Sequence, residues 1–193
     1  MNQTKTTRLR NTILAVSAVL FVLVSGANAQ QKLGDFVTEG GFDWLIGKWQ
    51  ATTDEGDKFE LVYEWGLEKY MATIHFKTPD LEYRGMIFYV PTEDKIVQVG
   101  VDNQGGNGKG TWEAQGNKAV LKHEYTGVDG QSSKMGFAHL KVDANAMKWE
   151  IYEVYSSGEL GDYPTYTIDF KRQKGQTPKK EGDKSEQKKK KDS

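Results

Sequence analysis

The sequence predicts an all-β fold, an antiparallel up-and-down β-barrel of about ten strands with a short N-terminal helical turn. Apolar and aromatic residues recur at every second position over short runs, which is the pattern of strands with one buried face. Gly, Asn and Asp separate these runs about every ten residues, as in consecutive hairpins. A long meander exposes two edge strands unless its first strand pairs with its last, so we predict a closed barrel rather than a sandwich.

The alternation is clearest in residues 58–66, where Phe59, Tyr63 and Trp65 alternate with mostly polar residues. One helical turn or two is expected within residues 35–45, where two glycines limit its length. The strands are expected at residues 47–54, 58–66, 70–77, 82–90, 95–102, 109–114, 118–126, 132–142, 146–156 and 163–171.

The N-terminal residues 1–29 have the three-part build of a secretory signal peptide. Basic residues come first, an apolar run follows over residues 13–24, and small residues precede Gln30. The apolar run is about 12 residues long, whereas a spanning helix needs about 20. We therefore expect an exported protein, periplasmic or secreted, that does not span the membrane.

The rest of the chain divides into a lead-in at residues 30–41, a barrel at 42–172 and a Lys-rich tail at 173–193. The tail has almost no apolar residue to bury, so we expect it to be disordered. Residues 30–170 carry a net charge of −10. A basic tail on an acidic body can attract an anionic partner weakly, or it is only a solvated end. No specific nucleic-acid partner is predicted.

The stretch Phe42-x-Trp44-Leu45-x-Gly47-x-Trp49 resembles the start of lipocalin-like (calycin) β-barrels. Within that group the chain is most similar to the DUF1579 class of uncharacterised bacterial proteins. The resemblance implies that the Trp49 indole closes one end of the barrel as a structural plug. Gly47 then lets the strand bend as it enters the sheet. The resemblance also places a basic residue of the last strand, Lys171 or Arg172, against that indole.

Neither a cofactor nor a metal is predicted. A related group of haem-binding barrels continues the motif as Gly-x-Trp-x-Gly-x-Gly, but this chain has Ala51 and Thr53 at the later glycine positions. The three histidines, His75, His123 and His139, stand at no ligand spacing from one another, and the chain has no cysteine.

The chain has more aromatic residues than are needed to close one end of the barrel. Strand parity turns His123 inward. Such rings either line a ligand cavity or simply fill the interior. The residues expected to contact a small apolar or aromatic ligand are Tyr63, Trp65, His123, Tyr125 and Trp149.

The charged residues give little support for a catalytic or metal site. Parity turns Glu64 and Glu68 outward, and residues 102–108 suggest a flexible loop at the barrel mouth rather than a calcium site. Arg84 is outside the barrel if Tyr83 and Ile87 face inward, whereas the opposite parity makes it a cavity cation suited to a carboxylate ligand.

Three functions remain open at this stage. The first is an exported, non-enzymatic barrel that binds a small molecule in its lumen. The second is an enzyme that uses the same cavity with an inward histidine as acid/base, although the sequence contains no known hydrolase, zincin or nucleotide-binding motif. The third is a surface interaction protein that acts through its basic tail.

Overall fold

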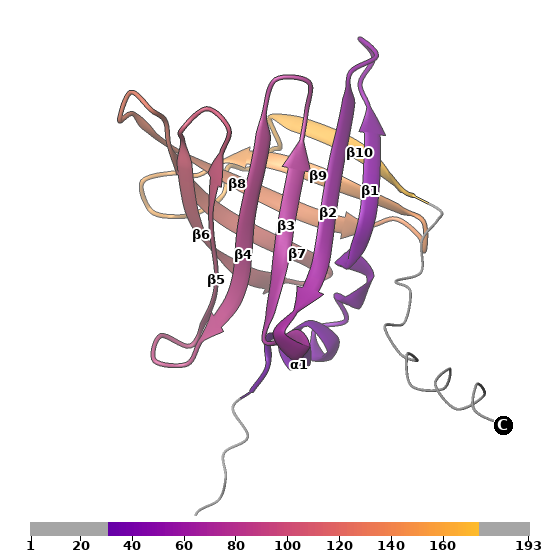
Figure 1. Cartoon of the computed structure of the whole chain (residues 1–193), viewed down its shortest axis with the longest axis vertical. Coiled ribbons are helices and arrows are strands. Elements are labelled where there is room, and N and C mark those ends of the chain that lie inside the picture. The colour runs from indigo at the N-terminus through magenta and orange to yellow at the C-terminus, as the bar shows by residue number, and fades with distance from the viewer. Residues whose placement is uncertain (1–30, 174–193) are drawn as a thin grey trace, which may run out of the picture. The chain divides into compact units, whose positions relative to one another are not determined.

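The computed structural model describes residues 31–173. The expected signal peptide and all but the first residue of the expected tail lie outside this part of the chain. The described residues form a meander of ten antiparallel strands that closes on itself, so the prediction of a closed all-β barrel is confirmed (Figure 1). The strands are β1 (Gly47–Thr52), β2 (Lys58–Gly66), β3 (Met71–Lys77), β4 (Glu82–Val90), β5 (Lys95–Asp102), β6 (Asn107–Gln115), β7 (Lys118–Thr126), β8 (Ser132–Lys141), β9 (Ala146–Glu153) and β10 (Tyr166–Arg172).

Closure occurs where β1 pairs with β10, with Trp49 opposite Arg172 and Gln50 opposite Lys171. The pairing continues past the last strand, because the Gln173 backbone N–H donates to the Lys48 carbonyl at 2.9 Å. Every strand of the meander therefore has two neighbours, which removes the free edges that would otherwise template aggregation.

The helical lead-in is split in two. Helix α1 (Leu33–Glu39) is followed by a separate 3-10 turn, η1 (Asp43–Leu45), where one helical segment within residues 35–45 was expected. Gly41 has φ +72°, a left-handed conformation that suits glycine and interrupts the helix. Together α1 and η1 lie across one end of the barrel (Figure 1). We call this the α1 end and the opposite one the loop end.

Trp49 is buried at the α1 end of the barrel, at the position expected for the plug. Its side chain is 1% exposed, and its Nε1–H donates to the Leu45 carbonyl at 2.9 Å. The Arg172 guanidinium lies 4.0 Å from the centre of the indole and donates to the carbonyls of Trp44 and Ile46. Of the two basic residues considered from sequence, it is therefore Arg172 that contacts the plug.

Gly47 is needed at the start of β1 for two reasons. Its φ is +139°, a value that residues other than glycine rarely adopt. A Cβ at this position would also clash with the Arg172 guanidinium. The glycine thus makes room for the cation that clamps the floor.

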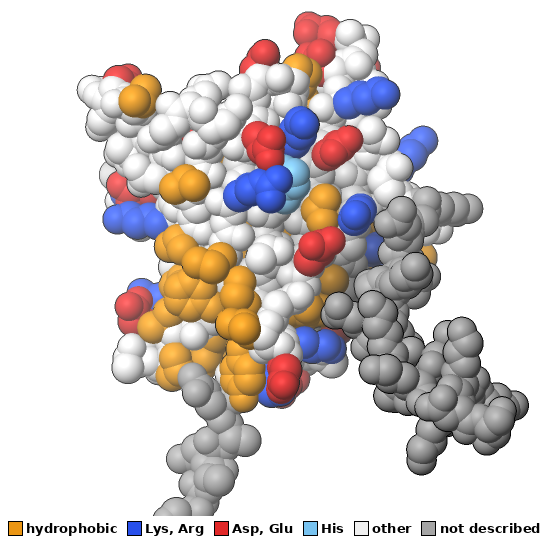
Figure 2. Space-filling view, in the orientation of Figure 1, with side chains coloured by type: hydrophobic (Ala, Val, Ile, Leu, Met, Phe, Trp, Pro, Cys, Tyr) orange, Lys and Arg blue, Asp and Glu red, His pale blue; other side chains and the backbone are white. Residues whose placement is uncertain are grey.

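Strand parity agrees with the sequence interpretation for most charged residues. Glu60, Glu64 and Glu68 are exposed, and Arg84 lies outside, where it pairs with Glu82 at 2.9 Å. The outward positions of β4 and β5 are unusually apolar, with Met86 47% and Val99 38% exposed. Figure 2 shows this hydrophobic surface toward the α1 end.

The largest boundary differences are at the end of β9, which stops at Glu153 rather than at 156, in β6 and at the start of β10. The expected strand 109–114 is longer in the structure, because β6 accommodates Gly108 at an inward position against the His123 ring. The last strand begins at Tyr166 rather than at 163, after Pro164, which has no N–H to donate to a ladder.

Candidate ligand-binding cavities

The interior of the barrel is not completely filled. A cavity of about 280 Å³ lies between α1 and the middle of the barrel, and a second of about 210 Å³ lies toward the loop end. We call them the floor cavity and the mouth cavity. Tyr63 lines both, so its side chain lies at the boundary between them.

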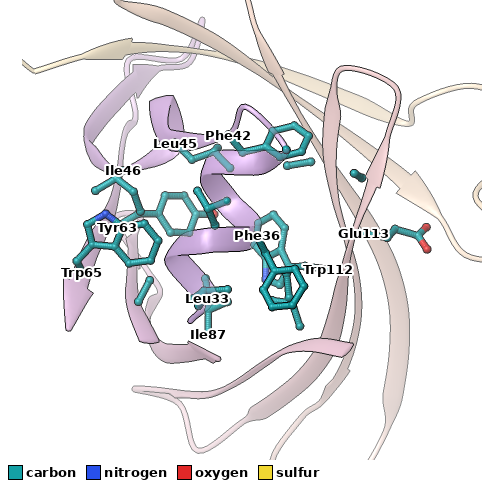
Figure 3. A pocket seen from close by; sticks show the side chains of 16 residues that line it. Leu33, Phe36, Phe42, Leu45, Ile46, Tyr63, Trp65, Ile87, Trp112 and Glu113 are labelled. Carbon is teal, nitrogen blue, oxygen red and sulfur yellow. The ribbon is translucent and has the colours of Figure 1, made fainter. Parts of the chain in front are cut away.

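The floor cavity has an apolar wall to which both the helix and the sheet contribute. Leu33 and Phe36 of α1 face Tyr63, Trp65 and Trp112 of the barrel wall (Figure 3). The helix is held in place by its own packing: Leu33 is 2% exposed, and the rings of Phe36 and Tyr89 lie 4.4 Å apart.

Glu113 is the one carboxylate among the residues that line the floor cavity. Its side chain points away from the apolar wall, as Figure 3 shows, and it pairs with Lys122 at 2.9 Å. The floor cavity therefore presents hydrocarbon and aromatic carbon to a ligand, without an ionised group.

A layer of aromatic side chains separates the two cavities. The Tyr63 hydroxyl lies 3.0 Å from His139 Nε2, and His139 Nδ1 lies 3.1 Å from the Ala119 carbonyl. Because a carbonyl only accepts, Nδ1 carries the proton and Nε2 accepts from the Tyr63 hydroxyl. The ring centroids of Trp112 and Trp149 lie 5.0 and 4.9 Å from that of His139.

Burial determines the protonation of this layer. His139 is fully buried, which lowers its pKa from 6.5 to about 3, although its backbone hydrogen bonds act in the opposite direction. Burial likewise raises the pKa of Tyr63 well above its ordinary value. At neutral pH the pair consists of a neutral imidazole and a protonated phenol, with each group already hydrogen bonded.

The mouth cavity is lined mainly by rings. Phe76, Phe137 and Trp149 pack together, with centroids 5.4 Å apart for Phe76–Trp149 and 5.5 Å for Phe137–Trp149. On the other side Tyr83 lies edge-on to His123, at 5.9 Å between centroids. These rings form an aromatic sleeve that leads from the loop end toward the middle of the barrel.

Inward glycines make room for the Tyr83 and His123 rings. Gly100 of β5 pairs with Gly108 of β6, so that two adjacent strands have no side chain at the same level. A Cβ at Gly100 would clash with the Tyr83 ring, and one at Gly108 would clash with the His123 ring. The two rings thus lie against bare backbone.

Asp102 is the carboxylate that lines the mouth cavity. Its Oδ2 accepts from the Tyr125 hydroxyl at 2.6 Å, and its Oδ1 accepts from the backbone amides of Gln104 and Gly106 at 2.8 and 2.9 Å. Partial burial raises the pKa of Asp102, but these hydrogen bonds outweigh it, and the pKa lies below the ordinary value. Asp102 is therefore ionised at neutral pH.

Two buried nitrogen atoms on residues of the mouth cavity have no hydrogen-bond partner within residues 31–173: His123 Nε2 and Trp149 Nε1. Burial lowers the pKa of His123, so this imidazole is neutral at pH 7. Unpartnered buried polar atoms are uncommon in folded proteins and call for an explanation.

The five residues expected to contact a ligand divide between the cavities. Tyr63, His123, Tyr125 and Trp149 line the mouth cavity, while Trp65 lies with Tyr63 on the wall of the floor cavity. Their contact with a ligand stays a prediction.

Sequence reasoning did not assign Asp102, His139 or the residues of α1 to a ligand site. The stretch 102–108 was expected to be one flexible loop, but only residues 103–106 connect the strands, and Asp102 is the last residue of β5. Parity with Phe137 turns His139 inward, but its contact with Tyr63 could not be predicted. Nothing local indicates that Leu33 and Phe36 fold across the lumen.

Metal and acid/base chemistry gain no support from this geometry. In the described part of the chain, no three His, Cys, Asp or Glu side chains come together in a way that could hold a metal ion. His75 faces outward, where its Nε2 lies 2.9 Å from Glu82. Both nitrogens of His139 are engaged, and no hydrogen bond within residues 31–173 joins His123 to a carboxylate.

The structure thus defines a closed antiparallel barrel with internal cavities, an architecture compatible with a lipocalin-like fold. No family model matches the chain, and neither does any curated protein. None of the helices within residues 31–173 has the length and apolar character required to cross a membrane.

Proposed function

We propose that this chain is an exported, lipocalin-like protein that binds a small apolar or aromatic molecule in the lumen of its barrel. The observation that carries the proposal is the unfilled interior, with cavities of about 280 and 210 Å³. Small barrels are usually filled by side chains, so open space lined by rings suggests an occupant.

The size of the cavities limits the size of the ligand. Both volumes lie below the roughly 300 Å³ at which drug-sized sites begin. Apolar cavities of this kind stay dry and accept small aromatic molecules, because a ligand meets no bound water that it must displace. A molecule of one to three rings fits this description better than a fatty acid or a haem.

Export and kinship belong to the same proposal. Export is supported by the signal-like sequence of residues 1–29, and the expected mature chain begins at Gln30. Kinship with the DUF1579 class rests on the Gly47 and Trp49 motif and on the Arg172 clamp that accompanies it. Mass spectrometry of the protein recovered from the producing cell tests the cleavage site directly.

Native mass spectrometry and a fluorescence titration test ligand binding. The protein purified from its source should carry a small organic molecule that is released on denaturation. The ligand-free protein should then bind the neutral apolar probe N-phenyl-1-naphthylamine with saturable enhancement of its fluorescence. A ligand-free protein that binds neither this probe nor any smaller aromatic compound, such as indole, would overturn the proposal.

A further inference from the structure

The two ends of the barrel carry very different charge. Each end comprises the connecting segments and the last two residues of each strand that adjoin them, and the α1 end also includes residues 31–46. The loop end has ten acidic and two basic residues, a net charge of −8, whereas the α1 end has seven acidic and eight basic residues, a net charge of +1. Figure 2 shows several acidic side chains along the edge of the loop end.

A negative charge also lies at the outer end of the mouth cavity. Asp102 lines this cavity, and its carboxylate is ionised because Tyr125 and two backbone amides donate to it. Among the described residues 31–173, no lysine or arginine lines the cavity. Arg84, which the opposite strand parity would have placed inside, is outside and paired with Glu82.

The walls beside Asp102 also suit a cation. The cavity is lined by the rings of Phe76, Tyr83, Phe137 and Trp149. An aromatic face carries negative potential, so it attracts a desolvated organic cation. A carboxylate at the outer end of an aromatic sleeve therefore matches a positive group attached to an apolar body.

His123 adds no cation to this cavity, because burial lowers its pKa and leaves the imidazole neutral at pH 7. Its Nε2 is buried against Gly108 of β6 and has no partner within the described chain. An anionic ligand would therefore meet Asp102 and the acidic loop end, without an opposite charge in the cavity wall.

We propose that the mouth cavity selects organic cations: a primary or quaternary ammonium group carried on a small aromatic or apolar body. The ammonium group lies near Asp102, and the ring lies in the aromatic sleeve. The acidic loop end attracts the ligand from solution, since clefts lined by one sign of charge concentrate the opposite ion. This inference rests on the proposed function and names the ligand class of one of its two cavities.

Three probes of nearly equal shape test the charge preference. Phenethylamine, 2-phenylethanol and phenylacetate share one ring and differ in the charge of the side group. Isothermal titration calorimetry at pH 7 should show the amine binding at least tenfold more tightly than the alcohol, and phenylacetate more weakly than either. Equal affinity for amine and alcohol would overturn the proposal.

The Asp102→Asn variant tests whether the charge of Asp102 causes the preference for the amine. The asparagine carbonyl oxygen can still accept from the Gln104 and Gly106 amides, so the turn is retained while the charge is removed. The preference for amine over alcohol should fall to about twofold or less. Asp169→Asn is the matched control, because Asp169 is an exposed β10 carboxylate whose removal changes the net charge equally. A preference that survives Asp102→Asn, or that Asp169→Asn removes as well, would contradict the assignment.

The experiment separates failure of this inference from failure of the proposed function. If 2-phenylethanol or N-phenyl-1-naphthylamine binds without any preference for the amine, the cation site is wrong while the ligand-binding barrel stands. If amine, alcohol and apolar probe all fail to bind the folded, ligand-free protein, both proposals are wrong. Chemical-shift changes confined to residues of the mouth cavity on addition of phenethylamine would locate the site.

Discussion

The two ends of this barrel achieve stability and accessibility in opposite ways. At the α1 end, Trp49 is buried, hydrogen bonded and covered by Arg172, and a helix lies across the opening. At the loop end, hairpin turns rich in carboxylates surround the aromatic sleeve, and the charged residue that lines the sleeve is Asp102. One sheet therefore holds an apolar cavity and a cavity with a polar rim, and a layer of rings separates them.

The largest effect should come from removing the floor. Trp49→Ala deletes a fully buried indole, its bond to the Leu45 carbonyl and the surface on which Arg172 rests. We expect a loss of roughly 3–5 kcal/mol in the free energy of unfolding, measured by urea denaturation. Trp65→Ala, at a half-buried wall position, should cost clearly less. Equal losses for the two variants would show that the α1 end has no special floor.

The second effect concerns the layer between the cavities. The folded-state pKa of His139, about 3, lies below the unfolded value of 6.5, so the folded state binds fewer protons between these values. Its stability contribution is complete above pH 6.5 and declines as the pH falls toward 3, at up to about 1.4 kcal/mol per pH unit. Urea denaturation from pH 7 to 5 should show a loss of about 2 kcal/mol.

His139→Gln removes the titrating group and serves as the reference for that measurement. The variant is less stable at pH 7, but its free energy of unfolding should depend less on pH between 7 and 5. If wild type and variant show the same pH dependence, the buried imidazole is not the group responsible.

A third prediction separates the two cavities by filling one of them. Ala72 is 3% exposed and lines the floor cavity, so Ala72→Leu places extra volume there. Affinity for N-phenyl-1-naphthylamine should fall about tenfold if the probe occupies the floor cavity, while phenethylamine binding stays within twofold. Thr73→Leu, at the exposed neighbouring position, is the control. A parallel loss of both ligands would mean that the cavities act as one site.

The smallest effect should be electrostatic. Raising the salt concentration from about 20 to 300 mM screens the acidic loop end and should weaken phenethylamine binding by about threefold. Binding of neutral 2-phenylethanol should stay unchanged over the same range. A salt effect of equal size on both compounds would show that the acidic loop end does not contribute to the binding of the amine.

Much of the architecture could be predicted from short stretches of sequence. Period-two patterning located ten strands because each strand is half-buried, and the turn residues between them favour hairpins. The motif around Gly47 and Trp49 predicted a floor, and the structure shows Arg172 against it. Four of the five residues proposed to contact a ligand line the mouth cavity, since parity alone decides which side chains face inward.

The strands, their inward faces and the acidic character of the body follow from local periodicity and composition. Long-range contacts place α1 across one end, join Tyr63 to His139 across 76 positions of the chain, and bring Asp102 to Tyr125. These contacts depend on strand register and on glycines that leave space at Gly100 and Gly108, and both are properties of the closed sheet rather than of any single segment.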